Sequence, residues 1–413
     1  MKTWVLAPLG AATILGASTL YAQESTDDDA SSLTEMITGI DAKLNFRHRF
    51  EHVERDAFEK NANASTLRSR LTLETASYNG FVVLGEVDNV TAIGPDDYNS
   101  TENGQTQFPV VADPEGTDLN QLLVRYTHSD SGTVGTLGRQ RINHSDQRFI
   151  GGVAWRQNEQ TYDGLRGQWK GGDLSVDYAY VAQINRIFGP DDGVQAAQWE
   201  GQNHFLKADY KAGEKQKFSA FLYELQIDED PNYPGNRSVN NSTRTVGVEY
   251  SGSFGPFGLA AALATQSDTG DSLQSYTAPY YKLEGSYKFS GLKASVRYEV
   301  LGGDNGVGFK TPLATLHKFQ GWADKFLVTP GDGIEDLQLG LTGSVGKVKL
   351  GAFYHDFQAE DSSADFGTEI DLVATWPISK SWSLQGKYAN FSSDNPDRFD
   401  DTQVAWMTIQ FKL

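Results

Sequence analysis

The stretch GIDAKLNFRHRF, residues 39–50, alternates apolar and polar side chains at every second position. One parity holds Ile40, Ala42, Leu44 and Phe46, and the other holds Asp41, Lys43, Asn45, Arg47 and Arg49. Successive side chains of a strand point to opposite faces of its sheet. The stretch therefore predicts a β-strand with one apolar face and one ionic face.

The same period of two returns along the rest of the 413-residue chain and predicts eighteen strands, an even number. The expected strands are 39–54, 66–79, 80–93, 118–128, 132–141, 161–170, 173–186, 199–212, 215–228, 239–252, 255–267, 275–289, 291–302, 334–345, 347–357, 366–378, 380–391 and 401–413. Turns of a few residues, such as 171–172, alternate with long connections. The long connections are 94–117, 142–160, 187–198, 229–238, 303–333 and 392–400.

This alternation of short and long connections separates two all-β architectures. Soluble sandwiches have no reason to alternate so regularly, whereas outer-membrane barrels place short turns in the periplasm and long loops outside. One parity of each strand is apolar and is expected to face lipid, as in Leu71 with Leu73 and Leu122 with Val124. The last strand ends on alternating apolar residues up to Leu413, the kind of signal that barrel-assembly machinery recognises. We therefore expect residues 39–413 to form an eighteen-stranded transmembrane antiparallel barrel.

The N-terminus is typical of an exported protein. Residues 1–22 read as a secretory signal peptide with Lys2 ahead of an apolar run and Ala22 before the cleavage site, and 23–38 form a short polar segment. The chain has no cysteine and a formal net charge of -19, which argues against disulfides and against nucleic acid as a partner. The expected location is the outer membrane of a Gram-negative bacterium, in contact with its lipid.

The polar parity of the strands carries many cations. On the expected lumen face they include Lys43, Arg47, Arg49, Arg68, Arg70, Arg125, Arg139, Arg141, Arg166 and Arg297, and Arg148 with Arg156 lie on the loop 142–160. Rings of basic side chains select anions, and arginine binds carboxylates through paired hydrogen bonds. We expect a basic constriction on the N-terminal wall of the pore. The alternative is that carboxylates on the same faces, such as Glu74 and Asp177, neutralise these cations.

Three segments resemble the alginate-export family of outer-membrane proteins. They are GRQRINHSDQRFIGGVAWRQNEQTYDG (Gly138–Gly164), VADPEGTDLNQLLVRYTH (Val111–His128) and ATLHKFQGWADKF (Ala314–Phe326). The resemblance implies an eighteen-stranded barrel, and the family's namesake exports an anionic polysaccharide, alginate, through an arginine-lined pore. The residues for which this resemblance best implies a pore-lining role are Arg139, Arg141, Arg148 and Arg166.

The segment Thr311–Phe326 is the one place where the period shifts from two. Thr311 is expected to cap a helix that begins at Pro312 and to place Leu316 and Phe319 on one face, as a plug or gate at the pore mouth. The alternative is a surface loop with incidental apolar residues. The loops 142–160 and 303–333 are long enough to fold back into the lumen.

Enzymatic and metal-binding readings find little support. His144, Ser145 and Asp146 are adjacent in sequence, so they point in different directions and are not expected to form a triad. The acidic pieces 113–118, 189–193 and 331–333 are expected to be solvated turns, because none follows the spacing of a calcium-binding loop. We expect no catalysis, no cofactor and no metal.

The function that the sequence favours is a passive channel for anionic solutes, with uronate-type oligo- or polysaccharide as the first candidate. The main alternative is a general or substrate-selective porin that imports small organic nutrients. A third class, a structural or adhesion barrel, predicts a lumen that its own loops block.

Overall fold

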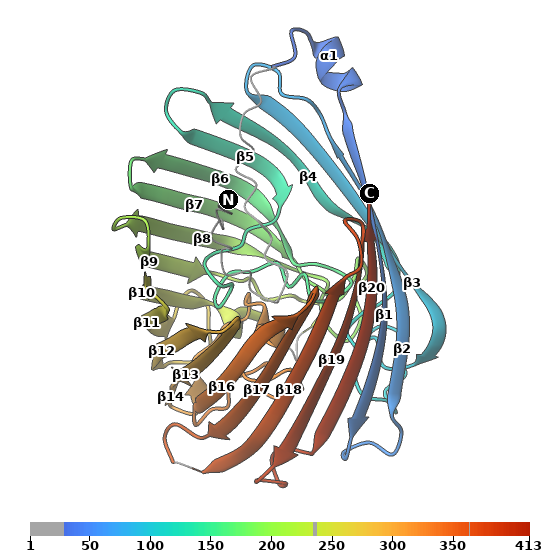
Figure 1. Ribbon diagram of the computed structural model, residues 1–413, viewed down its shortest axis with the longest axis vertical. Helices are drawn as coiled ribbons and strands as arrows, with labels where there is room; N and C mark the ends of the chain where they lie inside the picture. Colours follow the sequence, from blue (N-terminus) through green and yellow to red (C-terminus); the bar gives the residue numbers. More distant parts are fainter. Residues whose placement is uncertain (1–28, 234–237, 363) are drawn as a thin grey trace, which may run out of the picture.

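The computed structural model describes residues 29–233, 238–362 and 364–413, so the signal peptide expected at 1–22 lies outside the described residues. An 18-stranded antiparallel sheet closes on itself where β1 (Asp41–Arg55) pairs with β20 (Thr402–Lys412). Figure 1 shows these two strands side by side, blue against red, with the chain running in order round the wall. The predicted eighteen-stranded closed barrel is confirmed.

The remaining barrel strands follow one another in chain order. The first half of the wall continues with β2 (Ala62–Glu74), β3 (Phe81–Asp97), β4 (Gly116–His128), β5 (Thr133–Gln140), β6 (Thr161–Gly171), β7 (Leu174–Asn185), β8 (Gln198–Lys211) and β9 (Gln216–Leu225). The second half is β10 (Thr243–Phe254), β11 (Phe257–Asp268), β12 (Thr277–Phe289), β13 (Leu292–Leu301), β16 (Ile334–Val345), β17 (Val348–Gln358), β18 (Asp365–Pro377) and β19 (Trp382–Ser393). Outside the barrel sheet lie the small ribbon β14 (Gly303–Asp304) and β15 (Val307–Gly308), the helix α1 (Leu33–Thr38), and two 3-10 turns, η1 (Ser238–Asn241) and η2 (Leu316–Lys318).

The largest differences from the predicted strand boundaries are at both ends of β2, at the outer end of β3 and at the start of β10. β2 ends at Glu74 and not at 79, and β10 begins at Thr243 and not at 239. The outer ends of β2 and β3 have an identifiable cause. The two strands stay paired out to Asn63 and Asp97, beyond a register shift between Ala64 and Thr66. The sequence pattern ended at 66 and 93 because such a shift reverses the parity of the side chains that follow it. The rim of the barrel is therefore taller here than the alternation alone indicates.

The outward face is apolar at the positions that the parity predicted. Leu71, Leu122, Leu206 and Val296, from four different strands, are all exposed. On each of these strands the residues of the opposite parity point into the barrel. Each barrel strand exposes at least one large apolar side chain, which is costly in water but suits the hydrocarbon of a bilayer. The lipid-facing surface is thus built from single residues repeated around the wall.

The segment before the first strand contains structure that the sequence prediction lacked. Ser32 caps α1 by accepting a hydrogen bond from the backbone N–H of Glu35, and Met36 is buried. The carbonyl of Met36 accepts a hydrogen bond from the backbone N–H of Ala76, which lies in the short turn between β2 and β3. None of the helices in the described part of the chain is long and apolar enough to cross a membrane.

Candidate functional site in the barrel lumen

The loop between β5 and β6, residues 141–160, folds into the barrel. Its side chain Phe149 is buried against Phe221 of β9 and Tyr280 of β12, with ring centroids 4.9 and 5.2 Å apart. Further along, Trp155 packs edge-on against Trp406 of β20 at 5.7 Å. Because β9, β12 and β20 belong to different parts of the wall, this loop crosses the lumen rather than standing outside it (Figure 1).

The loop between β13 and β16, residues 302–333, also lies inside the barrel and joins the first loop. The backbone N–H of Gly151 donates to the carbonyl of Leu313 at 2.9 Å, and Phe326 packs against Phe357 of β17 at 4.7 Å. The predicted helix from Pro312 is wrong, since only the short turn η2 forms here. Gln320 (φ 47°) and Gly321 (φ 80°) adopt left-handed backbone, which ends any right-handed helix. The surface-loop alternative is wrong as well, because the apolar side chains are buried.

A basic cluster lines the wall formed by β1 and β2. Arg47 and Arg68 are directly opposite each other in register, and Arg70 lies two residues further along β2 on the same face. The guanidinium of Arg70 lies 2.5 Å from a carboxylate oxygen of Asp88 and 2.9 Å from one of Glu159. Both strands turn these arginines toward the interior of the barrel.

Arg141 joins this cluster from the loop. Its guanidinium binds Glu86 and Glu159, and Arg68 lies 3.7 Å from Glu159. Burial would raise the pKa of Glu159, but the neighbouring guanidiniums, Arg141 first, outweigh burial and hold that pKa well below its usual range. The carboxylate thus remains ionised and ties three arginines together.

Arg47 differs from the other arginines of this wall. Its Nε donates to the side-chain carbonyl of Gln157 and its Nη1 to the backbone carbonyl of Ala154, each at 2.9 Å, and a further bond goes to the carbonyl of Arg156. Among the residues that the structure describes, no carboxylate lies within ion-pair distance of it. Neutral carbonyls satisfy its donors without cancelling its charge.

Deeper in the lumen, buried carboxylates form ion pairs with the arginines. Arg49 lies 3.3 Å from Asp113, a loop residue that is fully buried and also accepts the backbone N–H of Gln157 at 2.8 Å. Burial would raise the pKa of Asp113, but Arg49 and then Arg156 lower it below the usual range. Sequence reasoning read Asp113 as part of a solvated turn, because nothing in the local pattern reports that its loop folds inward.

The other predicted lumen cations are each paired with an acid. The nitrogen-to-oxygen distances are 2.9 Å for Arg148 with Glu299, 3.0 Å for Arg297 with Asp336, 2.5 Å for Arg166 with Asp177, 2.6 Å for Arg125 with Glu74 and 3.0 Å for Lys43 with Asp41. Mutual neutralisation within the wall is therefore extensive. Arg47 on β1 is the exception, because its donors bind neutral carbonyls.

Arg139 does not belong to the lumen, contrary to the sequence prediction. It has the same parity as Leu137, which is 61% exposed on the outer face, and is in register with Leu122, which is 51% exposed. There it binds Asp163 with two hydrogen bonds of 2.8 and 2.9 Å. The prediction gave Arg139 and Arg141 one parity, but β5 ends at Gln140 and the chain then turns inward.

The sequence neighbours His144, Ser145 and Asp146 bind three separate groups. The ring Nδ1 of His144 lies 3.0 Å from the hydroxyl of Tyr223, Ser145 donates to Glu249, and Asp146 lies 2.7 Å from Lys282. The three side chains therefore form no triad. Within the described ranges, no three His, Cys, Asp or Glu side chains gather as metal ligands would.

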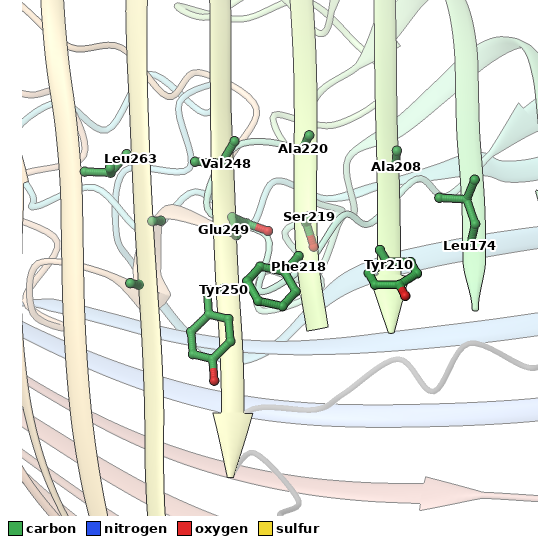
Figure 2. A pocket seen from close by; sticks show the side chains of 12 residues that line it. Leu174, Ala208, Tyr210, Phe218, Ser219, Ala220, Val248, Glu249, Tyr250 and Leu263 are labelled. Atoms are coloured by element: carbon green, nitrogen blue, oxygen red, sulfur yellow. The ribbon is translucent and has the colours of Figure 1, made fainter. Parts of the chain in front are cut away.

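An apolar hollow of about 450 Å³ lies on the outer face of β7–β11. Figure 2 shows Tyr210, Phe218 and Tyr250 near the strand ends, with the small side chains Ala208 and Ala220 beside them. Its rim residues are exposed with the lipid-facing parity. The hollow is therefore separate from the lumen and from any solute path through it.

The family model described as "Alginate export" matches residues 40–305, more than half of the chain. No curated protein sequence matches. Among solved structures, Pseudomonas aeruginosa OccK3 (OpdO) is similar with TM-score 0.68 and 12% identity, covering 92% of this chain and 97% of that one. P. aeruginosa OccK9 (OpdG) gives 0.68 and 16%, covering 92% and 99%, and Acinetobacter baumannii OccAB2 gives 0.69 and 13%, covering 92% and 99%.

These likenesses agree with the fold. The structural neighbours are outer-membrane barrels, and at such low identity they speak for the architecture alone. The family match and the barrel together place the protein in the outer membrane of a Gram-negative bacterium, as a protein of channel type.

Proposed function

We propose that this chain, which belongs to the alginate-export family, is a passive channel for anionic solutes, with uronate-type oligo- or polysaccharide as the first candidate cargo. The observation that carries the proposal is the cation cluster on β1 and β2. Arg47 faces Arg68 in register, and Arg47 has neutral carbonyls in place of a carboxylate partner within the described residues. A guanidinium that keeps its charge uncompensated attracts a passing carboxylate.

The proposed selection is electrostatic. Arginine side chains replace part of the water around a solute carboxylate, which lowers the cost of entering the narrow lumen. The carboxylates of Glu86, Asp88 and Glu159 form ion pairs with Arg68, Arg70 and Arg141. These ion pairs weaken the attraction of the three arginines for the solute. Weak attraction allows release, which conduction requires. The direction of transport is then set by the solute gradient.

A set of matched arginine variants in planar bilayers tests this selection. Arg47→Ser and Arg141→Ser each remove a positive charge on the lumen side, so the anion-to-cation permeability ratio is expected to fall. Arg139→Ser removes an arginine from the outer face of the same region and serves as the control, with an expected ratio equal to that of the wild type. An unchanged ratio in both lumen variants would exclude the proposed constriction.

A second candidate is a general or substrate-selective porin that imports small organic nutrients. The extensive pairing of Arg148, Arg166 and Arg297 with acids favours it, because paired charges shape the internal field without binding one class of solute strongly. Block of the current by oligouronates, but not by neutral sugars of equal length, supports the first candidate. Equal block by both supports the porin. Absence of conductance in the wild type and in all three arginine variants would favour a structural barrel.

A further inference from the structure

Two carboxyl groups of β18 lack the partners that buried acids require. Glu369 is 1% exposed and Asp371 is 0% exposed, and their shared parity points both into the barrel. One oxygen of Glu369 accepts the backbone N–H of Ala323 at 2.7 Å. In the described part of the chain, the other oxygen of Glu369 and both oxygens of Asp371 have no hydrogen bond of normal geometry, although the backbone N–H of Trp322 lies near Asp371. A buried charge without partners is strongly unfavourable.

The histidine on the neighbouring strand β17 is held by other groups. The ring Nδ1 of His355 lies 2.8 Å from a carboxylate oxygen of Asp336, which requires that Nδ1 carry a proton and donate. Its Nε2 lies 3.0 Å from the amide nitrogen of Gln338, which donates, so Nε2 carries no proton. Asp336 and Gln338 thus occupy the two ring nitrogens of His355. Its Nε2, 3.6 Å from Asp371, offers that carboxyl no donor.

The lysine on the other neighbouring strand, β19, attracts Asp371 but is not within ion-pair distance of it, and its hydrogen bond goes to another group. The ammonium of Lys387 lies 2.6 Å from Nε2 of His317, whose Nδ1 lies 2.9 Å from Asp324. It sits between the rings of Trp155 and Trp322, 4.0 and 3.7 Å from their centroids. Burial, and then the charge of Lys387, lower the pKa of His317 to about 3, so this imidazole is neutral and accepts the lysine's hydrogen bond.

The remaining charged groups nearby are already paired. On β16, Asp336 binds Arg297 at 3.0 Å, and in the loop Asp324 binds Arg156 at 3.3 Å. Lys325 binds Asp400 at 2.8 Å. Directly opposite Asp371 in register are Phe353 and Ala389, and opposite Glu369 are His355 and Phe391. Of these neighbouring cations only Lys387 is without an ion pair in the described structure, and its single charge cannot balance both carboxylates.

We propose that Glu369 and Asp371 share one proton and that this proton-binding site fastens the 302–333 loop to the barrel wall. The two carboxyls lie within hydrogen-bonding reach of each other. A proton on one of them removes one of the two charges and supplies an O–H donor to the other, as in carboxyl pairs that cannot both ionise. This site is separate from the anion-selecting cluster on β1 and β2 and does not depend on it. Loss of the proton at alkaline pH leaves two like charges beneath the loop.

The loop backbone rests directly on this pair. A Cβ added at Gly321 would lie 2.3 Å from one carboxylate oxygen of Glu369, so only glycine fits against it. Ala323, two residues on, donates its backbone N–H to the other oxygen of Glu369. Repulsion between the two ionised carboxylates is therefore relieved by movement of the loop away from β18, which lets water reach both groups.

Infrared spectroscopy of the folded protein tests the shared proton directly. Wild type is expected to show the C=O stretching band of a buried protonated carboxyl at neutral pH, and Glu369→Gln with Asp371→Asn is expected to lose it. Glu284→Gln, on a half-exposed lumen acid of β12, is the control and should keep the band. If the double variant does not fold, each single substitution is measured. A wild-type spectrum without the band at neutral pH would overturn the proposal.

Loop release has its own readout, because the chain contains no cysteine. A cysteine introduced as Ala323→Cys is buried beside the pair, and its rate of maleimide labelling, corrected for thiolate with a model thiol, is measured against pH. We expect the corrected rate to rise about tenfold or more at alkaline pH. The same cysteine in the Glu369→Gln, Asp371→Asn background is expected to show a flat profile. Equal pH profiles of the labelling rate in the two backgrounds would refute the proposal that the shared proton fastens the 302–333 loop to the wall.

Discussion

Replacing Arg148 with methionine removes one half of a fully buried ion pair between the loop 141–160 and the wall. Arg148 is 1% exposed and lies 2.9 Å from Glu299, which is 0% exposed. Breaking a buried pair by deleting one partner costs about 3–5 kcal/mol. Glu299 keeps a hydrogen bond from Tyr280 and has Arg297 at 3.8 Å, so we expect about 3 kcal/mol, the lower end of that range.

A double-mutant cycle isolates the charge term of this loss. In Arg148→Met with Glu299→Gln, the uncompensated charge is gone, so we expect about 1.5–2 kcal/mol of the stability to return. The free energy of unfolding is measured by urea titration in lipid vesicles with tryptophan fluorescence as the signal. A single-variant loss below about 1 kcal/mol, or no recovery in the double variant, would show that this pair does not hold the loop.

Three further substitutions or conditions give separate tests. Gly321→Ala places a Cβ against Glu369 at a residue with φ 80°, and we expect a loss of about 1–3 kcal/mol in the same urea titration. Val296→Arg puts a charge on the lipid-facing side of β13, and we expect a loss of about 2–4 kcal/mol on folding into bilayers. His317 has a folded pKa of about 3 against an ordinary 6.5, so the unfolded chain binds the extra proton between these values and stability falls as pH is lowered through that window. His317→Asn should flatten this pH dependence, by up to about 1.4 kcal/mol per pH unit.

The barrel could be predicted because each strand repeats a local signal. Alternation such as that of residues 39–50 reports which side chains face lipid, and Arg47, Arg68 and Arg166 indeed point into the lumen. Parity fails only where the strand itself ends or bulges. Arg139 follows the parity of β5, on the outer face with Leu137, and was misplaced because it was grouped with Arg141, which lies beyond the end of β5 at Gln140.

The interior of the lumen could not be predicted, because it depends on contacts between distant parts of the chain. Phe319 and Trp322 have helical spacing with their neighbours, but their burial comes from the wall and from Arg148, not from a helix. The pairing of Arg49 with Asp113 likewise joins β1 to a loop that sequence alone leaves outside. Propensity gives way to tertiary packing at such positions.

The most direct test of an anion-selecting lumen is the zero-current potential of the purified wild-type protein in a planar bilayer under a KCl gradient. The cation cluster of Arg47, Arg68 and Arg70 predicts a potential whose sign corresponds to preferred passage of chloride, with a magnitude that shrinks as ionic strength rises. A potential of the opposite sign, corresponding to preferred passage of potassium, would contradict the account.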